Sequence, residues 1–185
     1  LVLALFLLHL AQVTTCVEFS YAPYCEPSIE DTDTCDTFCQ NMGIVSWGSN
    51  SSTQKWTFRI QNGNGTAGTI RVEANGGFFV GNTVVTDTEW HHVAVTWAND
   101  GTPNIQDAKL YVDGVLDAEF GSIDVPPSGS QSVAINTAVG EDVRIGEDFQ
   151  LNHNWRGGID EVRIYDEAPV SYTHLTLPTK PKVEI

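Results

Sequence analysis

The chain has 185 residues, enough for one domain with a sizeable core and two terminal segments. It carries 24 Asp and Glu residues against nine Lys and Arg residues, a formal net charge of −15. A surface of that charge repels nucleic-acid phosphates and anionic membranes, so we expect neither as a partner. The acidic balance is compatible with calcium or neutral sugars, but we favour the plainer explanation, which is solubility.

The first fifteen residues are predicted to be a signal-peptide-like segment. Residues 1–10 are almost wholly apolar, and residues 11–15 are small or polar, as in the apolar and cleavage regions of an export signal. The run is too short to span a bilayer as a helix, and no later segment is longer, so we expect no membrane span. The alternative is a buried strand or helix of the domain itself. We favour the signal, which predicts a secreted, extracellular protein.

Residues 16–43 form an acidic segment that contains every cysteine of the chain: Cys16, Cys25, Cys35 and Cys39. An even number of cysteines in an exported protein predicts two disulfides, with three connectivities open. A zinc site is the alternative, but the cysteine spacing lacks the paired C-x2-C motifs of zinc ribbons, so we favour disulfides. We expect Cys35 and Cys39 not to pair with each other, because the three residues between them are not glycine-rich.

From Lys55 onward the apolar residues follow the two-residue period of strands. Trp56, Phe58 and Ile60 alternate with polar residues, which indicates a strand with one buried face. Asp113-Gly114 between two such runs is a strong hairpin signal. Further short strands are expected over residues 70–74, 78–80, 83–85, 90–97, 109–112, 115–120, 132–136 and 143–145.

No segment shows a sustained helical period with caps, so the domain is predicted to be all-β. Short strands separated by turns at this spacing favour a two-layer antiparallel β-sandwich. Eight residues are expected in its core: Trp56, Phe58, Ile60, Val72, Leu110, Val112, Val162 and Ile164.

Three phrases in order carry a family resemblance: residues 89–97 (EWHHVAVTW), 110–114 (LYVDG) and 157–165 (GGIDEVRIY). Residues 44–169 resemble the laminin-G-like jelly roll of the concanavalin A-like lectin and glucanase superfamily. The resemblance implies a jelly-roll sandwich and a function in extracellular binding, but no particular ligand or reaction.

The two ends of the chain depart from that family. Members have several strands ahead of the segment that matches residues 44–48, whereas residues 26–40 here are acidic and lack alternation. Two alternatives follow: a small disulfide-tied cap replaces those strands, or the sandwich is incomplete at its N-terminal strands because this part is a fragment or a frame error. Residues 170–185 look like translated sequencing adapter, a non-native tail, and we expect residues after Ser171 to form no core strand.

The strand over residues 90–97 carries a pair of histidines and a pair of tryptophans. His91 and His92 are adjacent, so their side chains point to opposite faces and cannot share one ligand, which favours a structural role. Trp90 and Trp97 are seven positions apart and also point to opposite faces. One is expected in the core, and the other is available to stack on a sugar.

Asp160 is the candidate metal ligand. By alternation it shares a side with Val162 and Ile164, and a carboxylate on an apolar side needs a cation, a metal or hydrogen bonds. The family resemblance implies a structural Ca²⁺ there. A backbone-capping role is the alternative.

A polar and aromatic loop precedes the last strand and is the candidate ligand rim. Side-chain amides and arginine bond to hydroxyls while tryptophan stacks, so this composition suits a binding site. Its residues are Asn152, His153, Asn154, Trp155 and Arg156.

A glycosidase needs two carboxylates that flank the scissile bond. Glucanases of the resembled superfamily place alternating acids on one strand, and this sequence has only the pair Asp117 and Glu119 on a short hairpin arm. We therefore expect no enzyme. The sequence favours non-catalytic binding of a glycan or an extracellular protein, as part of a larger secreted protein, with a structural or adhesive spacer as the alternative.

Overall fold

The computed structural model describes residues 5–11, 41–48, 55–61, 65–74, 76–87, 89–97, 104–129, 134, 142–148, 153–155 and 157–165. The strands are β1 (Leu5–Ala11), β2 (Gly43–Gly48), β3 (Lys55–Ile60), β4 (Thr69–Ala74), β5 (Gly77–Val84), β6 (His91–Thr96), β7 (Lys109–Val112), β8 (Val115–Glu119), β9 (Arg144–Ile145) and β10 (Gly158–Tyr165). A short 3-10 helix, η1 (Ile105–Asp107), precedes β7.

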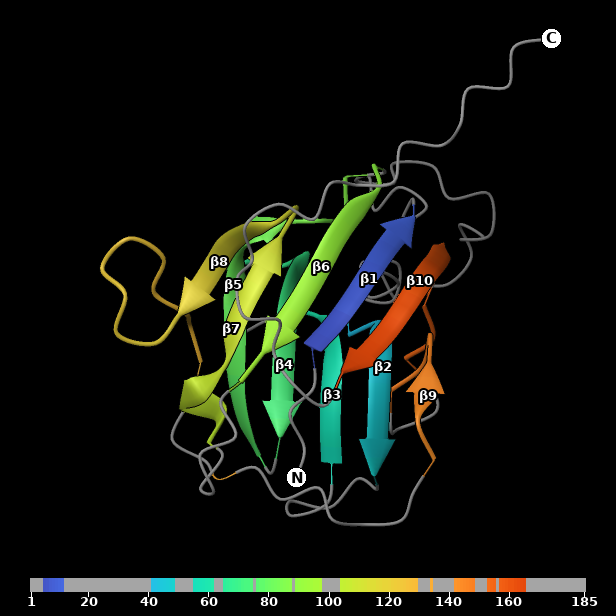
Figure 1. Ribbon diagram of the computed structural model, residues 1–185, viewed down its shortest axis with the longest axis horizontal. Helices are drawn as coiled ribbons and strands as arrows, with labels where there is room; N and C mark the ends of the chain where they lie inside the picture. Colours follow the sequence, from blue (N-terminus) through green and yellow to red (C-terminus); the bar gives the residue numbers. More distant parts are fainter. Residues whose placement is uncertain are drawn as a thin grey trace, which may run out of the picture.

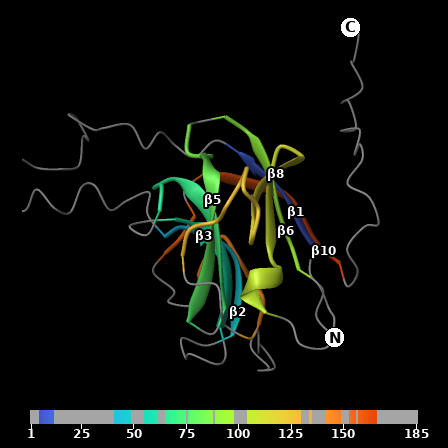
Figure 2. The ribbon, with the colours of Figure 1, turned by 90° about the vertical axis from the view of Figure 1, so that its left-hand side faces the viewer.

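The strands form two five-stranded antiparallel sheets that pack face to face. Sheet A has the order β10-β1-β6-β7-β8, and sheet B has the order β5-β4-β3-β2-β9 (Figure 1). Figure 2 views the two layers from the side, with β5, β3 and β2 in one layer and β8, β6, β1 and β10 in the other. The prediction of an all-β two-layer sandwich is confirmed.

Aromatic side chains join the two layers in the core. Trp56 of sheet B stacks on Trp47, with ring centroids 4.0 Å apart and planes 11° apart. On its other side Trp56 meets Trp97, which follows β6 of sheet A, at 5.3 Å. Trp56 and Phe58 are fully buried, as their alternation predicts.

The core prediction holds except at the C-terminal strand. Six of the expected residues are buried: Trp56, Phe58, Ile60, Val72, Leu110 and Val112. Val162 is partly buried against the core, but Ile164 is 50% exposed, so its predicted burial was wrong. β10 is an edge strand of sheet A, and the neighbouring edge of sheet B is β9, which has only two residues (Figure 1). A strand that short leaves the end of β10 uncovered.

The predicted strands over residues 78–80 and 83–85 form one continuous strand, β5. Gly81 lies between the two predicted strands, and a Cβ atom there would collide with Asp117 Oδ2. The glycine therefore marks a close approach of two strands and not a break in β5. At the Asp113-Gly114 hairpin both residues have positive φ, 51° and 80°, as the Asp-Gly signal predicts.

The N-terminal segment forms β1 in the interior of sheet A. It pairs with β10 on one side, from Leu5 opposite Tyr165 to Ala11 opposite Gly158. On the other side it pairs with β6, where Phe6 lies opposite Val95. Residues 5–11 thus form a strand of the domain, which was the alternative to the predicted export signal. Their removal as an export signal stays a prediction.

Several expectations fall outside the described residues. These are the pairing of the four cysteines, the tail over residues 170–185 and the predicted strand over residues 132–136. Of that strand only Ala134 is described, and it forms an isolated bridge with Asn104. The expectations for these segments stay predictions.

The carboxylate of Asp117 ties sheet A to sheet B. Asp117 lies on β8 and is buried, and it accepts hydrogen bonds from the Asn82 N–H at 2.9 Å and the Thr83 N–H at 2.9 Å. The Thr83 hydroxyl donates to the same carboxylate at 2.5 Å. All three donors come from β5, so one side chain satisfies backbone groups of the opposite layer.

We predict that Asp117→Ala lowers the free energy of unfolding by about 1–3 kcal/mol, because two part-buried N–H groups of β5 lose the buried carboxylate that accepts from them. Urea denaturation measures the change. Asp124→Ala, at an exposed carboxylate on the loop after β8, is the matched control and should change stability by less than about 0.5 kcal/mol. Equal effects of the two substitutions would contradict this role for Asp117.

Candidate functional site

Two side chains of the predicted rim loop, those of His153 and Trp155, bind other residues of the domain. His153 Nδ1 pairs with the carboxylate of buried Asp148. Trp155 donates its Nε1–H to the Gly158 carbonyl at 3.1 Å and packs against the core. Asn154 is exposed, while Asn152 and Arg156 lie outside the described residues. The structure thus leaves Asn154 as the described residue of this loop that faces solvent, and the loop's ligand role stays a prediction.

Asp160 does not lie on the apolar side of β10, so that expectation was wrong. Asp160 is exposed, whereas Ile159 and Val162 pack against the core. The register with β1 shifts between Asp160 and Arg163, and Glu161 has a positive φ of 52°. A bulge of this kind changes which residues share a face, which simple alternation cannot anticipate.

The described contact of Asp160 is with the backbone of the next residue, Glu161. Asp160 Oδ1 accepts a hydrogen bond from the Glu161 N–H at 2.8 Å, the backbone-capping contact of the alternative. Within the described part of the chain, no group of three or more His, Cys, Asp or Glu side chains is placed to hold a metal ion. Calcium binding through Asp160 stays a prediction.

A hydrogen-bonded group lies where β6 begins, at one end of sheet A. His91 Nδ1 is 2.8 Å from Asp113 Oδ2, and His91 Nε2 is 3.0 Å from Asp87 Oδ1. Asp113 Oδ1 also accepts from the His92 N–H at 2.8 Å. His91 is thus tied between the hairpin turn of β7 and β8 and the segment before β6. The structural role predicted for the histidines fits this arrangement.

Charge and hydrogen bonds shift the pKa values of this group. Burial by itself lowers the pKa of His91, but hydrogen bonds to Asp113 and Asp87 outweigh burial, and the pKa is raised. The pKa of Asp87 is lowered, first by a hydrogen bond from the Glu89 N–H at 3.0 Å and then by His91. Asp87 therefore remains an ionised acceptor.

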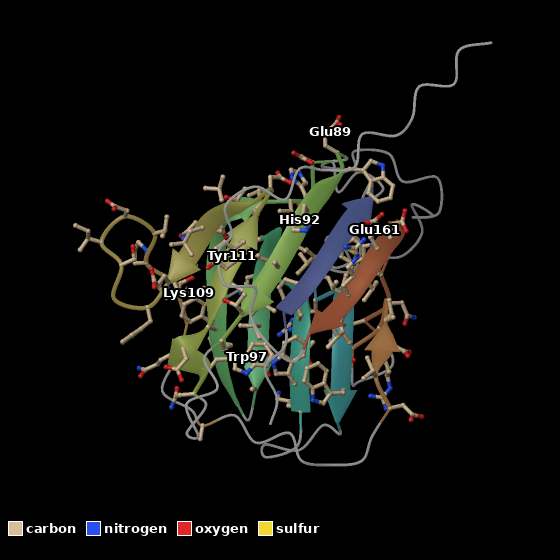
Figure 3. All side chains as sticks on the ribbon, viewed as in Figure 1. Glu89, His92, Trp97, Lys109, Tyr111 and Glu161 are labelled. Atoms are coloured by element: carbon tan, nitrogen blue, oxygen red, sulfur yellow. The ribbon has the colours of Figure 1, made fainter. Side chains whose placement is uncertain are left out.

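The residue directly before His91 in the chain is an exposed tryptophan. Trp90 is 54% exposed, whereas Trp97 is 2% exposed in the core, so the two tryptophans divide as the sequence predicts. Glu89, its neighbour, is exposed at the same end of sheet A (Figure 3). The sequence did not reveal that Asp87 and Asp113 flank His91. The Asp113-Gly114 signal indicated only a turn, and Asp87 stood in a segment without a motif.

A second polar group lies on sheet B and faces away from the core. Glu73 Oε1 pairs with Lys55 Nζ, and Glu73 Oε2 accepts from Arg59 Nη2 at 3.1 Å and from Arg71 Nη2. We call these residues and Thr57, which lies opposite Glu73 in the β3–β4 ladder, the Glu73 cluster. Arg71 and Glu73 are each only 6% exposed. The Arg71 guanidinium also lies 3.8 Å from the ring centroid of Phe78.

Burial and the neighbouring cations shift the pKa of the Glu73 carboxyl in opposite directions. Burial by itself raises it, but Arg71, the Lys55 hydrogen bond and Arg59 together lower the pKa to about 2. Burial, with a contribution from Arg59, lowers the pKa of Arg71 to about 10. A glycosidase acid needs a raised pKa, and the pKa values of Glu73 and Asp87 are both lowered.

The comparison with protein families matches residues 32–171 to the concanavalin A-like lectin/glucanases superfamily, through its laminin-G-like model. The match covers most of the chain, so the chain belongs to this family. Its domains are typically binding modules, generally non-catalytic and typically extracellular, although the superfamily includes glycosidases. The comparison with curated proteins finds no match. None of the described residues lies in a helix long and apolar enough to cross a membrane.

We predict that Glu73→Gln lowers the free energy of unfolding by about 3–5 kcal/mol at neutral pH, because three cations lose their buried counter-charge. Urea denaturation provides the measurement. Glu119→Gln is the matched control, since it breaks the more exposed Lys109–Glu119 pair at 2.5 Å and should cost less than about 1 kcal/mol. Because the folded-state pKa of Glu73 is depressed to about 2, its contribution is present above pH ~4.5 and is lost as the pH falls toward 2.

The His91 group predicts a stability change in the neutral range. A raised folded-state pKa means that the contribution of protonated His91 is fully present below pH ~6.5 and is lost as the pH rises through the folded-state pKa. The difference in unfolding free energy between the wild type and His91→Gln should therefore shrink between about pH 5.5 and pH 8. Thermal or urea melts at each pH measure it. A difference that stays constant over this range would contradict the prediction.

Proposed function

We propose that this domain is a non-catalytic binding module of an extracellular protein, and that its ligand is a glycan. The observation that carries the proposal is the exposure of Trp90, which directly precedes His91, the residue that bonds to the carboxylates of Asp87 and Asp113. An indole face stacks on the apolar face of a sugar ring, and carboxylates accept hydrogen bonds from sugar hydroxyls. Family membership supports the binding role, because domains of this family are generally non-catalytic.

The arrangement around Trp90 suits a rigid receptor. Asp87 and Asp113 are about half exposed, so they can reach a ligand while His91 holds both of them in place. Acceptors that are already oriented lose little side-chain entropy when a ligand binds. With a net charge of −15, the chain favours a neutral sugar over a polyanion at this acidic end of sheet A.

A glycan array probed with the full chain tests the proposal. We expect binding to a subset of neutral glycans, and Trp90→Ala should weaken it about five- to tenfold through lost stacking. Phe120→Ala is the matched control, because Phe120 is also an exposed aromatic residue, 49% exposed, on the loop after β8. It should leave binding unchanged.

Asn154→Ala separates this site from the predicted rim loop. If Asn154→Ala weakens glycan binding and Trp90→Ala does not, the ligand lies at the rim and the Trp90 site is wrong. Binding of the chain to no glycan at all would favour an extracellular protein ligand or a spacer role, and would contradict the proposed function.

A further inference from the structure

Both ring nitrogens of His91 lie within hydrogen-bond distance of a carboxylate. Nδ1 is 2.8 Å from Asp113 Oδ2, and Nε2 is 3.0 Å from Asp87 Oδ1. An ionised carboxylate only accepts hydrogen bonds, so each ring nitrogen needs a proton to form its bond. The imidazolium has two N–H groups, whereas the neutral imidazole has one. Protonated His91 can therefore make both bonds, and neutral His91 must lose one of them.

The bond to Asp113 is the one that neutral His91 keeps. The Asp113 N–H donates to the His92 carbonyl at 2.7 Å, and Asp113 Oδ1 accepts from the His92 N–H at 2.8 Å. These two bonds hold the Asp113 carboxylate against β6 whatever the charge of the imidazole. Asp87 lies between β5 and β6, and its Oδ1 also accepts from the Glu89 N–H of the same segment at 3.0 Å. That bond moves with the segment, so the contact between Asp87 and the ring is the one that opens.

The surroundings of the ring favour the imidazolium. Within the described part of the chain its bonds are those to the two carboxylates, and Glu89 adds an exposed acid on the segment before β6. On the other side of β6, β1 places Leu10 opposite His91 and His9 opposite His92. Burial lowers the pKa of His91, but the hydrogen bonds to the carboxylates outweigh burial and raise the pKa. The ring therefore loses its proton above pH ~6.5, in the range where histidine acts as a pH sensor.

We propose that His91 is a positioning residue whose proton controls ligand binding at Trp90. The inference rests on the proposed function. In the chain Asp87 lies shortly before Trp90, and His91 directly follows it. The bond between the side chains of Asp87 and protonated His91 thus closes the segment that carries Trp90. When the proton leaves, the Nε2 lone pair faces an acceptor oxygen, and the segment is released.

The effect on a ligand follows from this closure. A closed segment presents Trp90 and the carboxylate of Asp87 in one orientation, so little conformational entropy is lost when a glycan binds. An open segment must first be ordered, and the affinity falls with the fraction of molecules in which the segment is closed. The domain therefore binds its glycan at mildly acidic pH and releases it at higher pH.

An NMR titration of the full, 15N-labelled chain without ligand tests the positions of the protons. Between about pH 5 and pH 9, the ring of His91 should change from protonation at both nitrogens to protonation at Nδ1. Histidine free in water prefers the proton on Nε2, so this tautomer is a specific result. The order parameter of the Trp90 backbone N–H should fall with the same midpoint, because the segment is released. A neutral His91 protonated at Nε2, or an order parameter that stays constant, would overturn the inference.

The glycan array of the proposed function, probed at about pH 5.5 and pH 8.5, tests the effect on binding. The signals of the wild-type chain should be about fivefold weaker at the higher pH. His91→Gln should bind equally at both pH values, because a glutamine amide does not titrate. His92→Gln is the matched control: it replaces the neighbouring histidine and should keep the wild-type pH dependence.

Two results of the array would also overturn the inference. They are equal wild-type signals at the two pH values, and a pH dependence that persists in His91→Gln. Absence of binding to any glycan at either pH overturns the proposed function, and with it the control of glycan binding. The two failures are distinguishable, because one abolishes binding altogether and the other leaves binding without its dependence on the His91 proton.

Discussion

The contact between Trp56 and Trp97 is the interaction on which the arrangement of the two sheets depends. It joins β3 of sheet B to the end of β6 in sheet A, with ring centroids 5.3 Å apart, and Trp47 extends it as a stack. Aromatic side chains bury more area than any other residues, so this group fixes the separation of the layers at that end. Trp97 follows one end of β6, and His91, bonded to Asp87 and Asp113, begins the other end.

Sheet B is unusual because its polar face is buried as well as its apolar face. Every residue of β4 is buried, including Arg71 and Glu73. A strand covered on both sides is normally apolar throughout, as in parallel sheets. Here the second face holds charges, which must be neutralised and hydrogen-bonded where they lie. The fold meets that requirement at Glu73, whose carboxylate pairs with Lys55, Arg59 and Arg71.

Alternation in the sequence predicted most of the fold, because a strand with one buried face has apolar residues at every second position. Trp56, Phe58 and Ile60 are examples. It failed at Asp160, where the bulge at Glu161 changes the facing of neighbouring residues without any local signal. It also could not identify the Glu73 cluster. Lys55, Arg59, Arg71 and Glu73 alternate with apolar residues, which is the pattern of an ordinary solvated face.

The position of β1 has a consequence for the order in which the domain forms. Leu5 pairs with Tyr165 and Phe6 with Val95, so both partners of β1 lie far from it in the sequence. Contacts so remote in sequence form late and slow the folding of β-sandwiches. Because β1 lies between β10 and β6, cleavage after residue 15 would remove the strand that joins them in sheet A. Removal as an export signal and the sheet as it stands are therefore mutually exclusive fates of residues 5–11.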